Sequence, residues 1–512
     1  MIFQKLVASP PDSLIRIADL SFKSEVQKLA FTKFALGKDS ADPINLLLTP
    51  YDKESELSSA IVHQRVNDCL NYLQKEVENK PEVKKVKFIY DYVHKTFFKV
   101  YKLKNSFSDI FEKGEYNCVS ATALYAIIFS KLGIPYQIKE LPEHVYLIAY
   151  PYSTKILIET TNPEKGYYRV NDDIQKKYVK HLFDSKTISK QEYESSDINT
   201  LFNKYYFSSE NISLIQLIGL QYSNYGLYDF EDKNYEVAIS ELKKAYFLYP
   251  SEGNKYTLKL FLSYQIANNS YNDQKQIDNL AILCRYNNLK DSEISNESIK
   301  GEFSRIIQTQ LIDNSDFQKF EKSHATISGA LTDSALVNDI DFSYHLELAR
   351  LGYVNSKDSE FETNHLQAAF LINPHNANLQ AIILGYFERR VQKHSEVKSI
   401  LSLTEEYSRK FDFLNDNDEF NSIKANCLLE LSYQSFSLND ITKGEAFLKD
   451  FENFCELKKE LKPNPAFVER AFSVAASAYY KKGNYSKSKQ FLKTGLKYAP
   501  DSFGLKQRLS QF

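Results

Sequence analysis

The chain beyond residue 212 repeats one spacing of residues three times, and this repetition constrains the fold more than any other feature. Each copy places a leucine four residues after its first position, a small residue after seven and a proline after twelve. Positions four and seven apart share one face of an α-helix, small residues let a second helix pack closely, and proline ends a helix. The pattern therefore predicts stacked helical hairpins, although Glu362 stands where a small residue is expected. The copies are Ala238, Leu242, Ala245 and Pro250; Glu362, Leu366, Ala369 and Pro374; and Ser488, Leu492, Gly495 and Pro500.

Large and small residues precede the first and last copies at the spacing of a partner helix. Each pair of helices resembles a unit of the tetratricopeptide repeat (TPR) family, which implies a solenoid of antiparallel helix pairs over 212–512. Residues 255–340 and 377–460 keep helical periodicity without the full pattern. The resemblance also implies that the concave face of the array binds a protein or peptide. The partner-helix residues are Tyr222, Tyr225 and Gly226 before the first copy, and Phe472, Ala475, Ala476 and Tyr479 before the last.

Cys118 is the most reactive candidate in the N-terminal region, because it begins an apolar helix after a loop that contains Gly114. A thiol at a helix N-terminus lies near the positive end of the helix dipole, which favours the nucleophilic thiolate. The amide groups there are also suited to receive an oxyanion. The remaining cysteines fit helical patterns as small buried hydrophobic residues; they are Cys69, Cys284, Cys427 and Cys455.

His144 and Glu159 lie on two short strands predicted over 144–150 and 155–161. A two-residue turn between the strands would place the two side chains directly opposite one another. A four-residue loop would place them diagonally, but still on the same face. Either register brings the carboxylate near the imidazole, where it can hold the ring and stabilise its charged form.

These residues stand in a longer pattern that resembles the core of the transglutaminase-like (papain-like Cys-His-Asp/Glu) superfamily. The resemblance covers 81–170 and implies that Cys118 is the nucleophile, His144 the general base and then acid, and Glu159 the orienting acid. The matching motifs are Gly114 with Cys118, the Leu-Gly-Ile-Pro of 132–135, His144-Val145 and Glu159-Thr160.

Two features depart from that superfamily. Many of its members have Asp where this chain has Glu159, and the extra methylene shifts the carboxylate, although Glu orients the base in other triads. The sequence also offers no obvious side-chain donor for an oxyanion. Tyr116 and Asn117, next to the nucleophile, are the candidates for contacts with an oxyanion or substrate.

The sequence therefore predicts an α+β N-terminal transglutaminase-like domain followed by an all-α TPR-like helical repeat solenoid. Residues 1–80 form an N-terminal helical segment that belongs to the enzyme-like domain, and 81–170 form its core. The polar stretch 171–211 is predicted to be a linker, and 212–512 are the repeats.

The composition of the chain disfavours several classes of function. The chain has 512 residues and balances 64 Lys and Arg against 66 Asp and Glu, so it has no overall field that would attract nucleic acid or an anionic membrane. No motif for a metal ion or an organic cofactor is present, and we expect neither. The sequence shows no signal peptide or membrane-spanning run, which predicts a cytoplasmic protein.

We expect a cysteine-dependent enzyme that hydrolyses or transfers the acyl group of an amide, joined to a protein-binding array. The pattern does not choose between hydrolysis, deamidation and crosslinking, and water is the default acceptor. An alternative is a catalytically inactive scaffold that uses the same parts for protein–protein interaction. A nucleic-acid-binding repeat array is a second alternative, which the charge balance disfavours. The substrate, the partner and the oligomeric state are not predicted.

Overall fold

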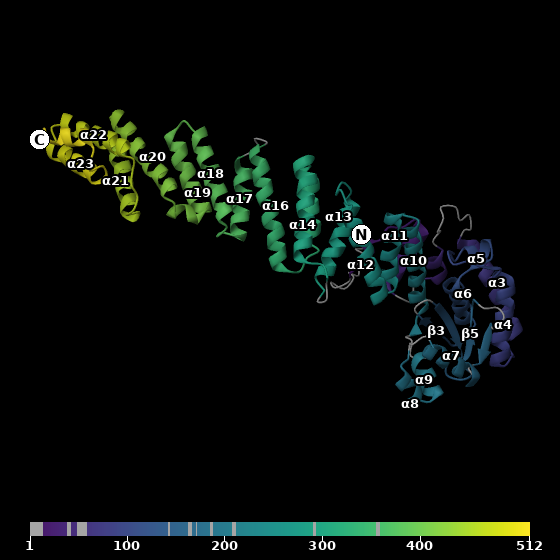
Figure 1. Ribbon diagram of the computed structural model, residues 1–512. Helices are drawn as coiled ribbons and strands as arrows, with labels where there is room; N and C mark the ends of the chain where they lie inside the picture. Colours follow the sequence, from purple (N-terminus) through teal and green to yellow (C-terminus); the bar gives the residue numbers. More distant parts are fainter. Residues whose placement is uncertain are drawn as a thin grey trace. The chain divides into compact units, whose positions relative to one another are not determined.

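The computed structural model of the chain divides into two compact units (Figure 1). The first comprises Met1–Ile299 with Gly329–Leu331, and the second comprises Lys300–Ser328 with Thr332–Phe512. The structure describes residues 14–37, 42–48, 59–141, 144–161, 166–169, 172–184, 188–206, 211–289, 293–354 and 359–512.

The N-terminal part of the first unit is helical where the structure describes it, as predicted. The helix that ends at Gly37 begins only after its N-cap Ser24, whose side chain accepts the Gln27 amide. A helix that follows Pro81 is also present as expected. The elements are η1 (Ile17–Asp19), α1 (Glu25–Leu36), α2 (Pro43–Leu47), α3 (Ser59–Val77), α4 (Glu82–Phe97), α5 (Asp109–Glu112) and α6 (Cys118–Lys131).

A five-stranded antiparallel sheet follows α6 in the order β6-β5-β4-β3-β7. A separate pair, β1 (Val100–Tyr101) and β2 (Glu115–Tyr116), is parallel and leads directly into Cys118. The strands of the main sheet are β3 (Tyr136–Leu141), β4 (His144–Ala149), β5 (Ile156–Ile158), β6 (Tyr167–Arg169) and β7 (Asn211–Ile212).

The loop between β4 and β5 adopts the longer of the two predicted lengths. Ile148 pairs with Leu157, and the Lys155 amide donates to the Tyr150 carbonyl at 3.0 Å, which encloses the four residues 151–154. Tyr150 and Lys155 take left-handed backbone angles, with φ of 52° and 47°, to close this loop. The register therefore places Glu159 diagonally to His144 rather than opposite it.

Helices cover both faces of the sheet. Thr122 of α6 lies 3.4 Å from Thr160, which places α6 on the face that Thr160 shares by alternation. The opposite face carries an apolar cluster formed with α7 (Asp172–Asp184) and α9 (Ile198–Tyr206). That cluster comprises Tyr146, Ile148, Leu157, Val179, Ile188, Leu201 and Phe202.

The predicted linker of 171–211 is wrong, because its described part is folded onto the sheet. Residues 172–184, 190–195 and 198–206 form α7, α8 and α9, and β7 adds an edge strand next to β3. Apolar residues spaced three and four apart on α7 and α9 explain this packing. Polar residues around α8 interrupt that periodicity, so the sequence pattern did not reveal it.

Helical hairpins make up the rest of the chain, as the repeat pattern predicts. The first two lie in the first unit and are α10 (Leu214–Glu231), α11 (Tyr235–Leu248), α12 (Glu252–Ile266) and α13 (Gln274–Asn287). The second unit begins within α14 (Asn296–Ile306). It continues with η3 (Ile307–Asp313), α15 (Phe317–Ser328), α16 (Ser334–Val354), α17 (Ser359–Ile372), α18 (Ala377–Lys393), α19 (Val397–Lys410), η4 (Asp412–Asp416), α20 (Asp418–Ser437), α21 (Ile441–Leu457), α22 (Pro465–Lys481), α23 (Tyr485–Tyr498) and α24 (Phe503–Leu509).

The repeat residues pack in the way that their spacing implies. A Cβ atom on Gly226 of α10 would lie 2.6 Å from Leu242 of α11, so only glycine allows this approach. A Cβ atom on Gly495 would similarly lie 2.9 Å from the Phe472 side chain. Across the part of the chain that is described, no helix is long and apolar enough to span a membrane.

The predicted domain boundary at residue 212 falls inside the first unit. The Tyr222 hydroxyl of α10 donates to the Leu46 carbonyl at 2.8 Å, and Arg285 of α13 makes a bidentate ion pair with Asp19. The first two hairpins are therefore part of the same core as the sheet and α6. The larger division of the chain occurs near residue 300.

Candidate active site

Cys118 is the first residue of α6, and a capping box holds the turn that presents it. Asn117 accepts the Ser120 amide at 2.8 Å, and the Ser120 hydroxyl accepts the Asn117 amide at 3.0 Å. These reciprocal bonds satisfy two of the amide groups that a helix start leaves without partners. Cys118 is half-buried, whereas α6 beyond it is almost wholly buried. Cys118 is thus partly accessible at the start of a buried helix.

His144 and Glu159 meet at the end of the sheet where β4 begins and β5 has just ended. The His144 Nε2 atom lies 3.0 Å and 3.1 Å from the two carboxylate oxygens of Glu159. Thr161 donates its hydroxyl to the same carboxylate at 2.9 Å, which fixes the orientation of Glu159. Since Nε2 is occupied by the carboxylate, Nδ1 is the ring nitrogen that remains for the Cys118 thiol.

Electrostatics favour the charged form of this histidine. Hydrogen bonds to Cys118 first and to Glu159 second raise the pKa of His144 to about 10, against the opposing effect of burial. Burial pushes the pKa of Glu159 upward, but bonds from His144 and Thr161 outweigh it and leave that pKa below its ordinary value.

The four remaining cysteines differ from Cys118 in burial. All four are buried. Burial raises the pKa of Cys69, Cys284 and Cys455 to about 12 and that of Cys427 to about 11. Their thiols therefore stay protonated near neutral pH, and Cys118 is the one half-exposed thiol of the five.

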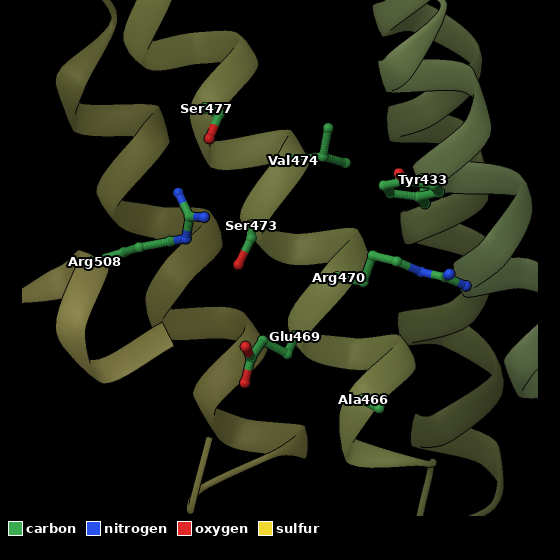
Figure 2. Close-up of a pocket in the computed structure, with 8 residues that line it drawn as sticks. All are labelled: Tyr433, Ala466, Glu469, Arg470, Ser473, Val474, Ser477 and Arg508. Carbon is green, nitrogen blue, oxygen red and sulfur yellow. The ribbon is translucent and has the colours of Figure 1, made fainter. Parts of the chain in front are cut away.

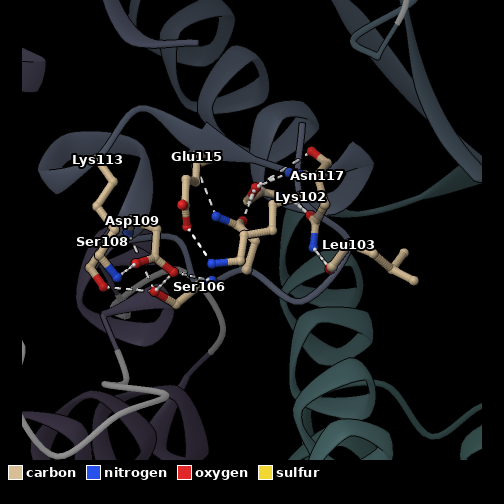
Figure 3. Close-up of polar contacts among 10 residues, drawn as sticks. Lys102, Leu103, Ser106, Ser108, Asp109, Lys113, Glu115 and Asn117 are labelled. Atoms are coloured by element: carbon tan, nitrogen blue, oxygen red, sulfur yellow. Dashed lines mark hydrogen bonds and ion pairs between the residues drawn. The ribbon is translucent and has the colours of Figure 1, made fainter. Parts of the chain in front are cut away.

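A polar network supports the turn before Cys118 (Figure 3). The Asn105 amide donates to the Glu115 carbonyl at 2.8 Å and accepts the Ser120 hydroxyl at 2.6 Å. The Asn117 side chain donates to the Leu103 carbonyl at 3.1 Å. Loop 102–106 is therefore bonded both to the strand before the nucleophile and to the first turn of its helix.

The first repeat helix holds the same loop from its other side. Gln221 of α10 donates to the Asn105 carbonyl at 3.0 Å, and the Tyr228 hydroxyl donates to the Leu103 carbonyl at 2.6 Å. Gln221 is fully buried and Tyr228 nearly so. The repeat array thus begins as a structural support for the Cys118 turn.

Tyr116 and Asn117 lie beside Cys118, as their positions in the sequence require, but the contacts that they make in the structure are structural. Asn117 is 1% exposed and uses its amide group for the helix cap and the Leu103 carbonyl. Tyr116 is 4% exposed, and its ring stacks on Phe98 at 4.6 Å. Their predicted contacts with an oxyanion or substrate stay a prediction.

Tyr101 is a residue that the sequence analysis missed. It pairs with Tyr116 in the β1–β2 register, two residues before Cys118, and its side chain is 47% exposed. Burial first, and then electrostatic interaction with Cys118, Tyr116 and Glu159, raises the pKa of Tyr101. Strands of two residues have no periodicity that a sequence pattern could reveal.

Within the described ranges, no three His, Cys, Asp or Glu side chains come together in a way that could hold a metal ion.

Comparisons with known proteins add little to this geometry. No family model matches the chain, and no curated protein matches it. Among solved structures, the chain is similar to one described as the structure of Naa15/Naa10 bound to HypK-THB, with 12% identity and a TM-score of 0.13. That match covers 66% of this chain and 63% of the other, so the chain spans less than two thirds of that protein. A TM-score this low supports no statement about fold or function.

Proposed function

We propose that the chain is a cysteine-dependent enzyme that cleaves or transfers the acyl group of an amide, as the resemblance to the transglutaminase-like superfamily implies. The observation that carries this proposal is the contact of His144 with Glu159 at 3.0 Å beside a half-exposed Cys118 at a helix start. A nucleophile, a base and a group that orients the base are the elements that such catalysis requires.

In the first step, Cys118 Sγ attacks the carbonyl carbon of the amide and the carbonyl electrons move to the oxygen. The oxyanion lies at the N-terminus of α6, where the Ser120 and Asn117 amides are already used by the capping box, so the amide groups of Cys118 and Val119 are the donors. The carbon–nitrogen bond then breaks, and His144 gives its proton to the leaving amine. A thioester of Cys118 remains.

In the second step, His144 takes a proton from water, and the hydroxide attacks the thioester and releases Sγ. An amine in place of water gives a new amide, which is the crosslinking outcome. Throughout, Glu159 stays ionised and keeps Nε2 protonated, so Nδ1 serves as the base and then the acid. Water is the simpler acceptor, and we favour hydrolysis.

The test is alkylation of the native protein by iodoacetamide at several pH values, with each cysteine followed by mass spectrometry. We expect Cys118 to react far faster than the other four cysteines below about pH 7, where an ordinary thiol of pKa ~8.5 is protonated. His144→Ala should abolish this advantage. His181→Ala is the matched control, because His181 lies exposed on α7, outside the site.

Slow alkylation of Cys118 that is unaffected by His144→Ala would overturn the enzyme proposal. It would leave the alternative function, an inactive scaffold that combines the domain with a protein-binding array.

A further inference from the structure

A short stretch of large apolar side chains is exposed next to the turn that presents Cys118. Val100, Tyr101 and Leu103 are 56%, 47% and 66% exposed. In the described part of the chain, no other run of four residues exposes three large apolar side chains. Exposed apolar groups that gather in one place mark a surface that another molecule covers.

This stretch runs beside the strand residues that lead into Cys118. Tyr101 is the register partner of Tyr116, two residues before the nucleophile. The side chain of Asn117, the next residue, donates to the Leu103 carbonyl at 3.1 Å. The exposed apolar residues therefore lie alongside the segment that ends at the thiol.

Hydrogen bonds fix the backbone of the stretch at both ends. The Val100 amide donates to the Gly114 carbonyl at 3.1 Å, and the Leu103 carbonyl accepts a second bond from the Tyr228 hydroxyl. Figure 3 shows the Leu103 side chain extending away from the bond that its carbonyl accepts from Asn117. Because the backbone is already ordered, a ligand that contacts these side chains does not have to order it.

The lysines next to these apolar residues are paired within the protein. Lys102 lies 3.0 Å from Glu115, and Lys104 lies 3.1 Å from Glu231 and 3.0 Å from Asp232. An anionic group of a ligand would have to displace one of these carboxylates. An uncharged apolar group meets no such competition, so the charges of this surface favour an apolar ligand group.

A groove in the second unit has a different lining. It has a volume of about 490 Å³, lies among α20, α22 and α24, and presents Glu469, Arg470 and Arg508 (Figure 2). Ser473 and Ser477 line it as well. Exposed apolar side chains are therefore a feature of the surface beside Cys118 and not of every recess in the chain.

We propose that Val100, Tyr101 and Leu103 bind an apolar group in the acyl part of the substrate. This inference rests on the proposed function, because it names the class of amide that the thiol attacks. The apolar group lies against the three side chains while Sγ attacks the neighbouring carbonyl, and its removal from water raises the second-order rate of acylation. Leu103 is the most exposed of the three and contributes most to this preference.

The test compares two esters of p-nitrophenol, the acetate and the hexanoate, on the full chain. Each ester acylates Sγ of Cys118 and releases p-nitrophenolate, and mass spectrometry identifies the cysteine that carries the acyl group. Each rate is divided by the rate of N-acetylcysteine with the same ester, which removes the intrinsic difference between the two esters.

Leu103→Ser is the test variant, and Leu103→Met retains an apolar side chain at the same position. Leu371→Ser is the matched control, because Leu371 is an exposed leucine of α17 in the second unit. The quantity compared among the variants is the ratio of the normalised hexanoate rate to the normalised acetate rate.

Hexanoate is longer than acetate by four methylene groups, and each methylene that is fully buried contributes about fourfold. An open surface buries only part of the chain, so we expect a ratio of at least about tenfold in the parent chain. Leu103→Ser should lower this ratio by about threefold or more, whereas Leu103→Met and Leu371→Ser should keep it.

Two results would overturn this inference alone, provided that Cys118 is acylated faster than N-acetylcysteine. They are a ratio near one in the parent chain, and a ratio that Leu103→Ser leaves unchanged. If Cys118 reacts with neither ester faster than N-acetylcysteine does, the proposed function fails as well.

Discussion

The first and last repeat hairpins share their internal design and differ in what covers them. Both bury the same small and leucine positions, and both turn through a left-handed residue, Lys233 with φ of 64° and Gly483 with φ of 75°. An asparagine follows each turn residue and begins the second helix, at Asn234 and Asn484. The repeat pattern thus encodes the hairpin, whereas the residues between its positions determine what the hairpin contacts.

The first hairpin is covered by the chain's own N-terminal segment. Glu241 of α11 is fully buried, and it pairs with Lys23 at 3.1 Å and with Lys244 at 3.2 Å. Phe31 packs edge-on against Tyr222 at 5.5 Å, and Gln27 donates to the hydroxyl of the same tyrosine. The buried charge of Glu241 is therefore balanced by lysines inside the fold, whereas Lys493 and Lys497 of the last hairpin are exposed.

Replacing one acidic residue that pairs with each hairpin should give the largest difference in stability between the two hairpins. Glu241→Gln leaves Lys244 and Lys23 without their buried counterion, so we expect a loss of roughly 3–5 kcal/mol of unfolding free energy. Glu445→Gln breaks the half-exposed pair with Lys487 and should cost below about 1 kcal/mol. Urea unfolding followed by far-UV circular dichroism measures both. Equal losses would show that the two hairpins are not differently covered.

Lysines at equivalent positions of the two hairpins should respond differently to pH. Burial first lowers the pKa of Lys243 from 10.5 to about 8, despite nearby Asp19 and Asp278, whereas Lys493 is exposed. The native state binds the proton of Lys243 more weakly than the unfolded state does. The loss of unfolding free energy that results from burying the charged lysine is therefore complete below pH 8 and disappears as the pH rises to 10.5.

The unfolding free energy of Lys243→Met relative to the parent chain should therefore fall by about 3 kcal/mol across that pH interval. The difference between Lys493→Met and the parent chain should stay flat over the same interval. A flat result for both variants would contradict the burial of a strained lysine in the first hairpin. Circular dichroism in urea at each pH provides the measurement.

Replacing Tyr101 can show whether this residue stabilises the structure of the active site or takes part in its chemistry. Acylation of Cys118 by p-nitrophenyl acetate passes through an oxyanion, whereas alkylation by iodoacetamide does not. If the Tyr101 hydroxyl is the missing donor, Tyr101→Phe should slow acylation by about tenfold or more and leave alkylation unchanged. Tyr152→Phe is the control, because Tyr152 is 88% exposed. Equal slowing of both reactions would assign Tyr101 a structural role.

Local patterns explain which parts of this fold could be predicted. The hairpins follow from periodicity within each helix, and α1 and α4 have the termini that Gly37 and Pro81 indicate. Both candidate registers of His144 with Glu159 followed from alternation, but the choice between them depended on the loop. That loop is closed by the bond from Lys155 to Tyr150, which no propensity specifies.

The features of the fold that could not be predicted depend on contacts between residues that are far apart in the sequence. The ion pair of Asp19 with Arg285 joins positions 266 residues apart, and nothing in either neighbourhood indicates the other. The support of loop 102–106 by Gln221 and Tyr228 is of the same kind. For that reason the sequence analysis placed a boundary at 212, where the structure has a continuous core.

The smallest predicted effect concerns the hydrogen bond from Tyr228 to loop 102–106. Tyr228→Phe removes one of the two hydrogen bonds that the Leu103 carbonyl accepts and should cost about 1 kcal/mol of stability, the ordinary net contribution of one such bond. Since that loop also caps the Cys118 turn, we expect a modest slowing of Cys118 alkylation. Tyr480→Phe on α22 is the control in the last hairpin, where the tyrosine is 52% exposed and supports no active-site loop. If Tyr228→Phe changes stability but not alkylation, the first hairpin stabilises the unit without positioning the nucleophile, and the two hairpins differ in burial alone.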